Sequence, residues 1–319
     1  MMGEVVLFPE ARVTAARDFR DAVLAGLSQD EKNIPSRFLY DARGSELFEA
    51  ITELPEYYPT RTEIALLQAC APEIARAIPP GAAVVEFGSG ASRKTELLLA
   101  ALDRPAAYIP IEISASALYP AARRIASAFP AVGVHPVLGG FHELGQMRLP
   151  VRDHFCLGFF PGSTIGNFTG TEAALFLRSA RRLLGRSAAL LIGADLQKPL
   201  DILIPAYDDA AGVTAAFNLN LLARINRELS GTFDLGAFEH CAIYNERKER
   251  IEMHLKSKSA QTVSVAGRNF AFREGESIHT ENSHKYSLSS FRWITARGGW
   301  ETAESWVDEH RLFSLHLLR

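Results

Sequence analysis

A regular alternation of strand-like and helix-like segments, between about residues 61 and 196, constrains the fold of this chain more than any other feature. Amphipathic helical patterns such as SALYPAARRIASAF and TEAALFLRSARRLLG separate short apolar runs. Strands that alternate with helices form a mostly parallel sheet with helices on both faces. The segment therefore predicts an open α/β sheet, with strands near residues 83–87, 108–113, 134–138, 155–160 and 188–194.

A glycine turn follows the first of these strands, in the stretch EFGSGASRKT. Gly88 and Gly90 allow a tight turn and a close approach to a ligand because they lack a Cβ, and such turns bind nucleotides beside a helix N-terminus. A dinucleotide dehydrogenase would carry GxGxxG, but Arg93 replaces the third glycine. Glu112 ends the next strand, where a carboxylate can accept hydrogen bonds from both ribose hydroxyls. These features favour S-adenosylmethionine over NAD.

The alternation is lost after residue 196. A helical pattern near 213–229 and strand-like alternation between 233 and 272 predict an inserted α+β subdomain. From residue 288 a further helical pattern leads into two strand-like segments, WETAESWVDE and LFSLHLLR, which we expect to complete the sheet. The first 60 residues do not follow the alternation and are rich in aromatic side chains.

Charge and cysteine content narrow the class of partner. The net charge is −3, and acidic and basic residues are mixed along the whole chain. The sequence therefore shows no cluster of basic residues that would bind nucleic acid or an anionic membrane. The three cysteines are far apart and in no Cys/His ligand spacing, so neither disulfides nor a metal site is expected. The even charge makes a small-molecule partner the expectation. We expect a cytoplasmic protein, because the chain shows neither a cleavable leader nor a membrane-spanning run, and we expect it to be a monomer.

Four motifs, in order, carry a resemblance over nearly the whole chain: YDARGSELFEAITELPEYYPTRTE, EFGSGASRKT, FFPGSTIGNF and IHTENS. Together they resemble the histidine Nα-methyltransferases of ergothioneine biosynthesis. The resemblance implies a Rossmann-like class I methyltransferase domain, at residues 61–196 plus 288–319. It also implies a second α+β domain that binds histidine, at residues 1–60 plus 197–287.

The resemblance further implies which residues contact S-adenosylmethionine, namely Gly88, Lys94, Glu112, Gly140 and Phe141, with Tyr40 near the methionine end. One position departs from the family pattern. Where relatives have Gly-Asp-Phe, this chain has Gly139-Gly140-Phe141, so an adenine-facing carboxylate is missing, and Glu143 or His142 stands as a possible replacement. Glu112 stands where many relatives have aspartate, which keeps the carboxylate and lengthens its reach.

For the histidine substrate, the matching positions are Tyr57, Asn167, Tyr207, Met253, Glu281 and Ser283, with Phe48, Gly162 and Thr214 as supporting walls. Their chemistry suits the ligand. Asn167 offers a donor and an acceptor to an α-carboxylate or α-amine, and tyrosine hydroxyls can donate to a carboxylate. Glu281 and Ser283 are two residues apart, which places both side chains on one face of an extended segment, where they can serve the two imidazole nitrogens.

The predicted activity is transfer of the sulfonium methyl group to the α-amine of L-histidine, three times, to give hercynine. The catalytic candidates are Asn167, which holds the substrate, and Tyr40, whose hydroxyl, or else water, takes the proton. Two alternatives stay open. One is an N-methyltransferase acting on another amino acid, such as a tryptophan derivative, and the other is a non-catalytic sensor of the nucleoside or amino acid.

Overall fold

The structure, a computed structural model, describes residues 10–90, 93–151 and 154–319. The chain divides into two compact units. Unit 1 consists of Pro59–Lys198 and His284–Arg319, and unit 2 consists of the described residues up to Tyr58 together with Pro199–Ser283. Among the described residues, no helix combines the length and the apolar character that crossing a bilayer requires.

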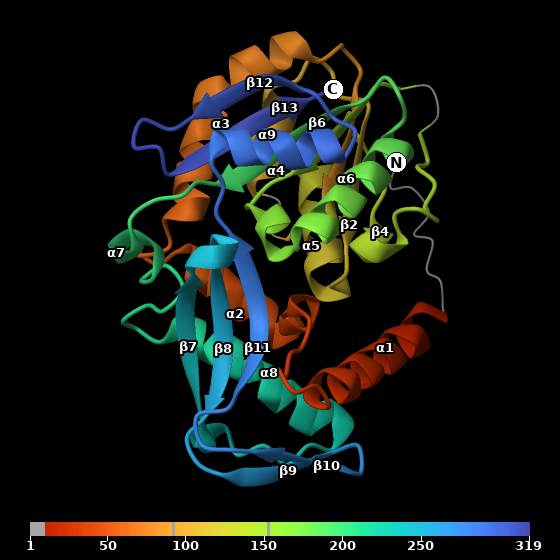
Figure 1. The fold of residues 1–319 in the computed structure, drawn as a ribbon. Coiled ribbons are helices and arrows are strands. Elements are labelled where there is room, and N and C mark those ends of the chain that lie inside the picture. Colours follow the sequence, from red (N-terminus) through yellow and green to blue (C-terminus); the bar gives the residue numbers. More distant parts are fainter. Residues whose placement is uncertain (1–9, 91–92, 152–153) are drawn as a thin grey trace. The chain divides into compact units, whose positions relative to one another are not determined.

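The described part of unit 1 contains an eight-stranded sheet with the strand order β12-β13-β6-β5-β1-β2-β3, in which β4 also pairs with β2 (Figure 1). The pairs among β1 to β6 are parallel, whereas β13 runs antiparallel to both β6 and β12. The strands are β1 (Ala83–Phe87), β2 (Ala107–Glu112), β3 (Gly133–Val134), β4 (Val137–Leu138), β5 (Cys156–Phe160), β6 (Ala189–Asp195), β12 (Thr302–Val307) and β13 (Phe313–Leu318).

The strand order contains a switch point between β1 and β5. From β1 the chain builds outward through β2 and β3, then returns to place β5 and β6 on the other side of β1. In open α/β sheets, ligands bind outside the carboxyl ends of the strands at such a point. The predicted α/β sheet is confirmed, including its two closing strands.

The third expected strand, 134–138, is wrong in one respect, because it is divided into β3 and β4. Gly133–Val134 pairs with the start of β2 and Val137–Leu138 with its end, and His135 and Pro136 lie between them. Proline has no N–H to donate to a strand ladder, so it interrupts the pairing at this edge of the sheet.

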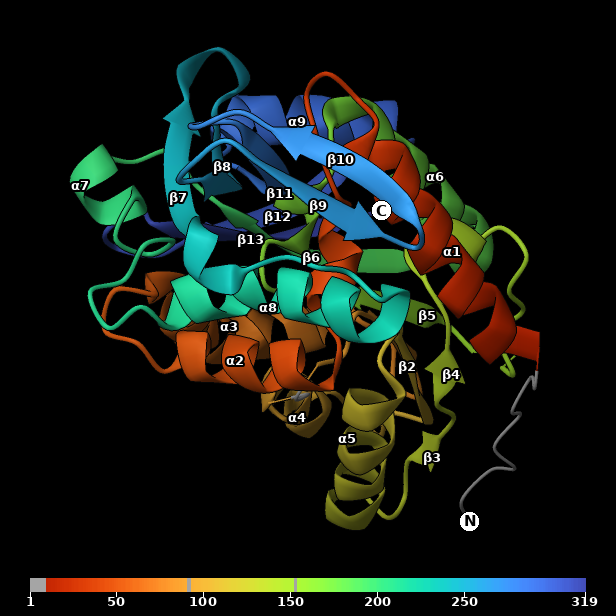
Figure 2. The same cartoon turned by 90° about the horizontal axis from the view of Figure 1, so that it is seen from below.

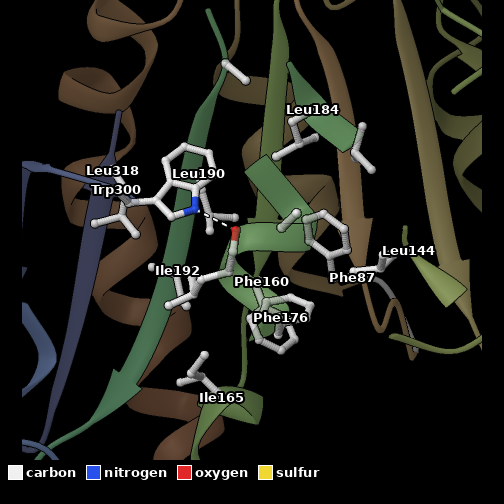
Figure 3. Packing of buried hydrophobic residues seen from close by; sticks show 14 of the residues in the cluster. Phe87, Leu144, Phe160, Ile165, Phe176, Leu184, Leu190, Ile192, Trp300 and Leu318 are labelled. Carbon is white, nitrogen blue, oxygen red and sulfur yellow. Dashed lines mark hydrogen bonds between the residues drawn. The ribbon is translucent and has the colours of Figure 1, made fainter. Parts of the chain in front are cut away.

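Helices cover both faces of the sheet. The bounds in unit 1 are α3 (Tyr58–Ala77), α4 (Arg93–Ala101), α5 (Ala115–Ala128), α6 (Gly170–Leu184) and α9 (Leu288–Arg297), with short 3₁₀ helices η2 (Phe141–Glu143) and η3 (Thr164–Asn167). Residues of α6 and α9 pack with Val85 and Phe160 on one face, and residues of α3, α4 and α5 pack with Val84 on the other. On the first face, the buried Trp300 also donates an indole N–H bond of 2.9 Å to the Leu177 carbonyl oxygen (Figure 3).

Unit 2 combines helices with two small sheets, of strand orders β11-β8-β7 and β10-β9. Helix α8 packs on β7 and β8, and it lies beside α2 (Figure 2). The predicted helix at 213–229 and the strand character within 233–272 are confirmed. The elements are α1 (Glu10–Leu27), η1 (Ser36–Leu39), α2 (Ala42–Thr52), α7 (Leu200–Leu203), α8 (Val213–Leu229), η4 (Leu235–Ala237), β7 (Phe238–Asn245), η5 (Glu246–Lys248), β8 (Arg250–Ser257), β9 (Gln261–Val265), β10 (Arg268–Phe272) and β11 (Ser277–His284).

Candidate active site

The glycine turn joins β1 to α4 at the carboxyl edge of the sheet. Gly88 has φ of +76° and Gly90 has φ of +45°, a region that side-chain-bearing residues rarely adopt. A Cβ on Gly88 would also lie 3.2 Å from Cζ of Phe141. The Gly88 N–H donates to the Ile111 carbonyl oxygen over 2.8 Å, which ties the turn to β2. Gly88 is therefore required both by backbone conformation and by the ring packed over it.

The Glu112 carboxylate lies at the end of β2 and faces this turn. Its Oε2 accepts from the Gly90 N–H over 3.1 Å, and its Oε1 accepts from the N–H groups of Ile113 and Ser114 over 2.9 and 3.0 Å. A carboxylate has about four acceptor positions, so these three bonds leave capacity mainly on Oε2, the oxygen on the side of the turn. The half-buried side chain is thus held in place at the position where sequence reasoning puts a ribose.

The other acidic residue of the motif, Glu86, has a different environment. It is 1% exposed, and its carboxylate accepts hydrogen bonds from the hydroxyls of Thr95, at 2.6 Å, and Tyr108. Burial raises the pKa of the Glu86 carboxyl to about 8. Glu86 therefore fastens the first turn of α4 to the sheet from inside the core.

Lys94 forms an ion pair with Glu63, a residue that sequence reasoning did not single out. Glu63 is fully buried on α3, and its two oxygens also accept from the Gly162 N–H at 2.8 and 3.0 Å. Gly193 in β6 makes room for it, since a Cβ there would lie 2.2 Å from Glu63 Oε1. This buried carboxylate connects two predicted site residues, Lys94 and Gly162, that lie far apart in sequence.

The segment FFPGSTIGNF forms the end of β5 and the turn after it. Gly162 and Ser163 both have positive φ, of +80° and +54°. Ser163 is buried in this left-handed conformation, and its Oγ accepts from the Asp195 N–H over 2.9 Å. Strained backbone of this kind persists where the surroundings hold it, often at functional sites. The turn leads into η3, which ends at the half-buried Asn167.

Phe141 belongs to a group of aromatic rings that pack together with the core on one face of the sheet. Its ring centroid lies 5.5 Å from that of Phe160, 5.9 Å from Phe168 and 5.4 Å from Phe176. The preceding residue, Gly140, has an extended backbone that any residue can adopt, with φ of −99° and ψ of 163°. Its N–H donates to Glu143 Oε2 over 2.8 Å, so Glu143 caps η2 from this position. The side chain of His142 lies outside what the structure describes.

Unit 2 brings four predicted residues together in a continuous aromatic group. Tyr40 and Phe48 have ring centroids 5.5 Å apart, Phe48 and Tyr57 6.2 Å, and Tyr57 and Tyr207 6.3 Å, all edge to face. Phe217 of α8, which sequence reasoning missed, contacts both Tyr40 and Phe48. Its only signal in the sequence is an apolar position on an amphipathic helix, which any core residue would give.

The remaining predicted residues of unit 2 come from three elements, α8, β8 and β11. The Tyr207 hydroxyl and Ser283 Oγ form a hydrogen bond of 2.7 Å, which joins β11 to the aromatic group. Glu281 and Ser283 are both buried, with 9% and 6% of their surfaces exposed. Met253 on β8 is also buried and accepts from Thr280 Oγ1 through its carbonyl oxygen, at 3.0 Å. Thr214 is buried in the first turn of α8, where its N–H donates to Asp209 Oδ1 over 2.7 Å.

Asp41, adjacent to Tyr40, anchors this part of the chain. It caps α2 by accepting from the Gly44 N–H over 2.8 Å, and it accepts from Asn220 over 2.8 Å and from Arg227 on α8. Burial opposes ionisation of Asp41, but these hydrogen bonds outweigh it and hold the pKa of the carboxyl below its usual value. Asp41 therefore fixes the backbone that carries Tyr40.

The predicted residues are thus divided between the units. Unit 1 holds all the predicted cofactor residues except Tyr40, together with Gly162 and Asn167 from the substrate set. Unit 2 holds Tyr40 and the other substrate residues, namely Phe48, Tyr57, Tyr207, Thr214, Met253, Glu281 and Ser283.

The sequence is similar to a known family of methyltransferases and to individual members of it. The sequence model of a family described as "Histidine-specific methyltransferase, SAM-dependent" matches residues 19–319. The chain is 43% identical over 310 residues to the histidine N-alpha-methyltransferase of Mycolicibacterium smegmatis, with 95% of each chain covered. It is 40% identical over 303 residues to the protein of that name from Mycobacterium tuberculosis, covering 93% of this chain and 94% of the other.

A longer fungal relative shares the same region. The chain is 32% identical over 294 residues to ergothioneine biosynthesis protein 1 of Neurospora crassa, a match that covers 90% of this chain and 33% of that protein. Since the family match takes in almost all of the sequence and two relatives match over nearly their full lengths, the chain belongs to the histidine-specific, S-adenosylmethionine-dependent methyltransferase family.

Proposed function

We propose that this protein transfers the methyl group of S-adenosylmethionine to the α-amine of L-histidine, three times, and so makes hercynine in the first step of ergothioneine biosynthesis. The observation that carries the proposal is the similarity to histidine N-alpha-methyltransferases over nearly the whole chain. The glycine turn, the strand-end carboxylate and the buried polar residues of β11 support it.

We assign cofactor binding to the switch point of unit 1. Gly88 and Gly90 let the backbone approach the ligand, and Glu112 accepts from the ribose hydroxyls. Phe141, whose ring packs over Gly88, provides an apolar surface. Lys94 is held by Glu63, and Glu63 in turn fixes the turn after β5 by accepting from the Gly162 N–H.

We assign recognition of histidine to the buried residues of unit 2. Glu281 accepts from an imidazole N–H, and Ser283, oriented by Tyr207, serves the second ring nitrogen. The aromatic group of Tyr40, Phe48 and Tyr57 encloses the substrate, and Met253 and Thr214 are further walls. Asn167, from unit 1, holds the α-carboxylate or the amine.

The reaction is an in-line displacement at the sulfonium methyl group. The cofactor supplies the electrophile, so the protein contributes alignment and desolvation of the amine. Only a neutral amine attacks, so the α-ammonium of histidine must lose a proton before the first transfer, and the nitrogen must lose another after each of the first two transfers, to water or to the Tyr40 hydroxyl. Each methyl group removes a donor from the nitrogen. Anchoring the substrate by its carboxylate and imidazole therefore lets all three rounds proceed in one pose.

Mass spectrometry of a reaction with S-adenosylmethionine tests the proposal. We expect mono-, di- and trimethylated histidine to appear in that order, and imidazole propionate, which lacks the α-amine, to stay unmodified. Tryptophan is run in parallel. Its trimethylation with histidine unreacted would overturn the choice of acceptor, and no methylation of either would favour the sensor.

A chelator is expected to leave catalysis unchanged. Displacement at a sulfonium carbon needs no Lewis acid, because the leaving group departs as a neutral thioether. The initial rate of histidine methylation is measured with and without excess EDTA, and we expect equal values. A loss that Mg²⁺ or Zn²⁺ restores would contradict this prediction.

Replacing Gly140 by aspartate is expected to tighten S-adenosylmethionine binding by about two- to tenfold. The change restores the carboxylate of the family pattern, the φ and ψ of Gly140 are angles that any residue adopts, and one added hydrogen bond contributes about 0.5–1.5 kcal/mol. Calorimetry measures the dissociation constant. Gly145→Asp is the matched control, since a Cβ there meets only open space. Unchanged or weaker binding in a folded Gly140→Asp protein would show that aspartate has no ligand partner at this position.

A further inference from the structure

Three potential metal ligands converge on one face of the β11-β8-β7 sheet in unit 2. Glu252 and His254 are two residues apart on β8, so they share a face, and Met253 between them points to the other. His279 lies on the neighbouring strand β11. The ligand atoms of the three side chains all lie within 4.8 Å of one another. The spacing of Glu252 and His254 does not mark the set by itself, because its third member, His279, comes from another strand.

Hydrogen bonds orient both imidazoles as metal sites require. The Nε2–H of His279 donates to the Glu281 carbonyl oxygen over 3.0 Å, which leaves the lone pair on Nδ1. His254 has Nδ1 3.2 Å from Ser277 Oγ and Nε2 3.3 Å from Glu252 Oε2. A histidine that binds a metal through one nitrogen usually bonds an oxygen through the other, and such partners fix its tautomer. Nε2 of His254 and Oε2 of Glu252 thus face each other, and a metal bound between them would replace their hydrogen bond, with the His254 proton moving to Nδ1 beside Ser277 Oγ.

The carboxylate is held from its other side. Glu252 is 7% exposed, and its Oε1 accepts from Arg250 Nε over 2.8 Å and from Asn245 over 3.0 Å. The positive charge of Arg250 beside this carboxylate weakens its attraction for a cation, so the two imidazoles must supply part of the affinity for the metal.

The side chains of His254 and His279 are both half-buried. The three-ligand set therefore keeps a side on which water can complete the coordination.

We propose that Glu252, His254 and His279 form a binding site for a divalent transition metal, and that Zn²⁺ fits it best. Two imidazoles with one carboxylate suit Zn²⁺, whereas Mg²⁺ and Ca²⁺ prefer oxygen ligands alone. With bonds of about 2.0–2.2 Å, neighbouring ligand atoms lie roughly 3.4 Å apart, so each side chain moves inward by about 1 Å or less.

The bound ion would connect β8 to β11 at the start of the strand that carries Glu281 and Ser283. Its role is to stabilise unit 2 rather than to take part in methyl transfer, which makes the proposal independent of the catalytic assignment. A metal that binds the native state alone raises the melting temperature by an amount that grows with the logarithm of its concentration relative to its dissociation constant.

Calorimetric titration of the untagged, chelator-treated protein with ZnCl₂ tests the site, alongside melting temperatures with and without the ion. We expect one Zn²⁺ per chain, a higher melting temperature, and binding that is at least tenfold weaker in both His254→Ala and His279→Ala. His310→Ala, which removes an exposed imidazole elsewhere, is expected to bind as the unmodified protein does.

Two results would overturn the site: no binding by the unmodified protein at up to about 1 mM Zn²⁺, or less than a tenfold loss in either variant. Because an alanine variant could fail to fold, His279→Gln, which keeps the size and polarity of the side chain, is measured as well and is expected to lose the same affinity. Circular dichroism confirms that each variant is folded.

Discussion

Replacing Glu281 by alanine is expected to raise the Michaelis constant for histidine by roughly tenfold to more than a hundredfold. A carboxylate that accepts from an imidazole N–H in an enclosed site forms a charge-assisted bond, and deleting it leaves a substrate donor unpaired at a cost of about 1–3 kcal/mol. Glu281 is 9% exposed, so water replaces the lost acceptor poorly. The affinity for S-adenosylmethionine is expected to change little, because the cofactor residues other than Tyr40 belong to unit 1.

Steady-state kinetics with histidine and tryptophan, side by side, measure this effect. The variant is expected to lose selectivity as well as affinity. In the unmodified protein a mostly apolar side chain such as that of tryptophan leaves the Glu281 carboxylate without a partner, and removing the carboxylate removes this penalty. Glu274→Ala, an exposed acidic residue of unit 2 outside the predicted site, is the matched control. If histidine turnover in Glu281→Ala equals that of the control, Glu281 does not read the imidazole, and histidine specificity must come from other residues.

Much of unit 1 follows from local sequence periodicity. The run Ala83–Phe87 is buried along its whole length, as a central parallel strand requires, and the glycine turn and helix after it are where the pattern puts them. The division of the third strand could also have been predicted, because Pro136 stands inside the expected run. Local patterns succeed here because each element is specified by residues close together in the chain.

The interactions that position the site residues join parts of the chain that are far apart in sequence. The periodicity of apolar residues does not predict such contacts. Glu63 is separated by 31 residues from Lys94 and by 99 from Gly162, and it looks like an ordinary acidic residue on a helix. The Glu252, His254 and His279 cluster forms only because β8 and β11 are neighbours. Neither arrangement can be inferred before the pairing of strands and the packing of helices are known.

The substrate residues of unit 2 were predicted by resemblance rather than by pattern. Tyr40, Phe48 and Tyr57 are spaced like packing residues of an amphipathic segment, and taken singly each has a structural explanation. The structure adds that they form one aromatic group with Tyr207 and that Tyr207 is bonded to Ser283. Their convergence gives a physical reason to treat the set as a binding surface.

Replacing Glu112 by alanine is expected to weaken S-adenosylmethionine binding by roughly tenfold to more than a hundredfold. The change removes the acceptor for the ribose hydroxyls, and a hydrogen bond to a charged group contributes about 1.5–3 kcal/mol. It also releases the Gly90 N–H, which Glu112 holds at 3.1 Å, so the glycine turn loses its tie to the end of β2. Both effects act on the bound cofactor, whereas the core around β2 is untouched.

Calorimetry with three variants separates these contributions. Glu112→Asp keeps the carboxylate that many relatives have, and is expected to bind within several-fold of the unmodified protein. Glu112→Gln keeps one acceptor oxygen without the charge and is expected to fall between aspartate and alanine. Glu96→Ala, which removes an acidic side chain of α4 that pairs with Arg124, is the control for net charge. If Glu112→Ala is folded and binds S-adenosylmethionine as tightly as Glu96→Ala does, the carboxylate has no ribose partner, and its three backbone hydrogen bonds are its whole role.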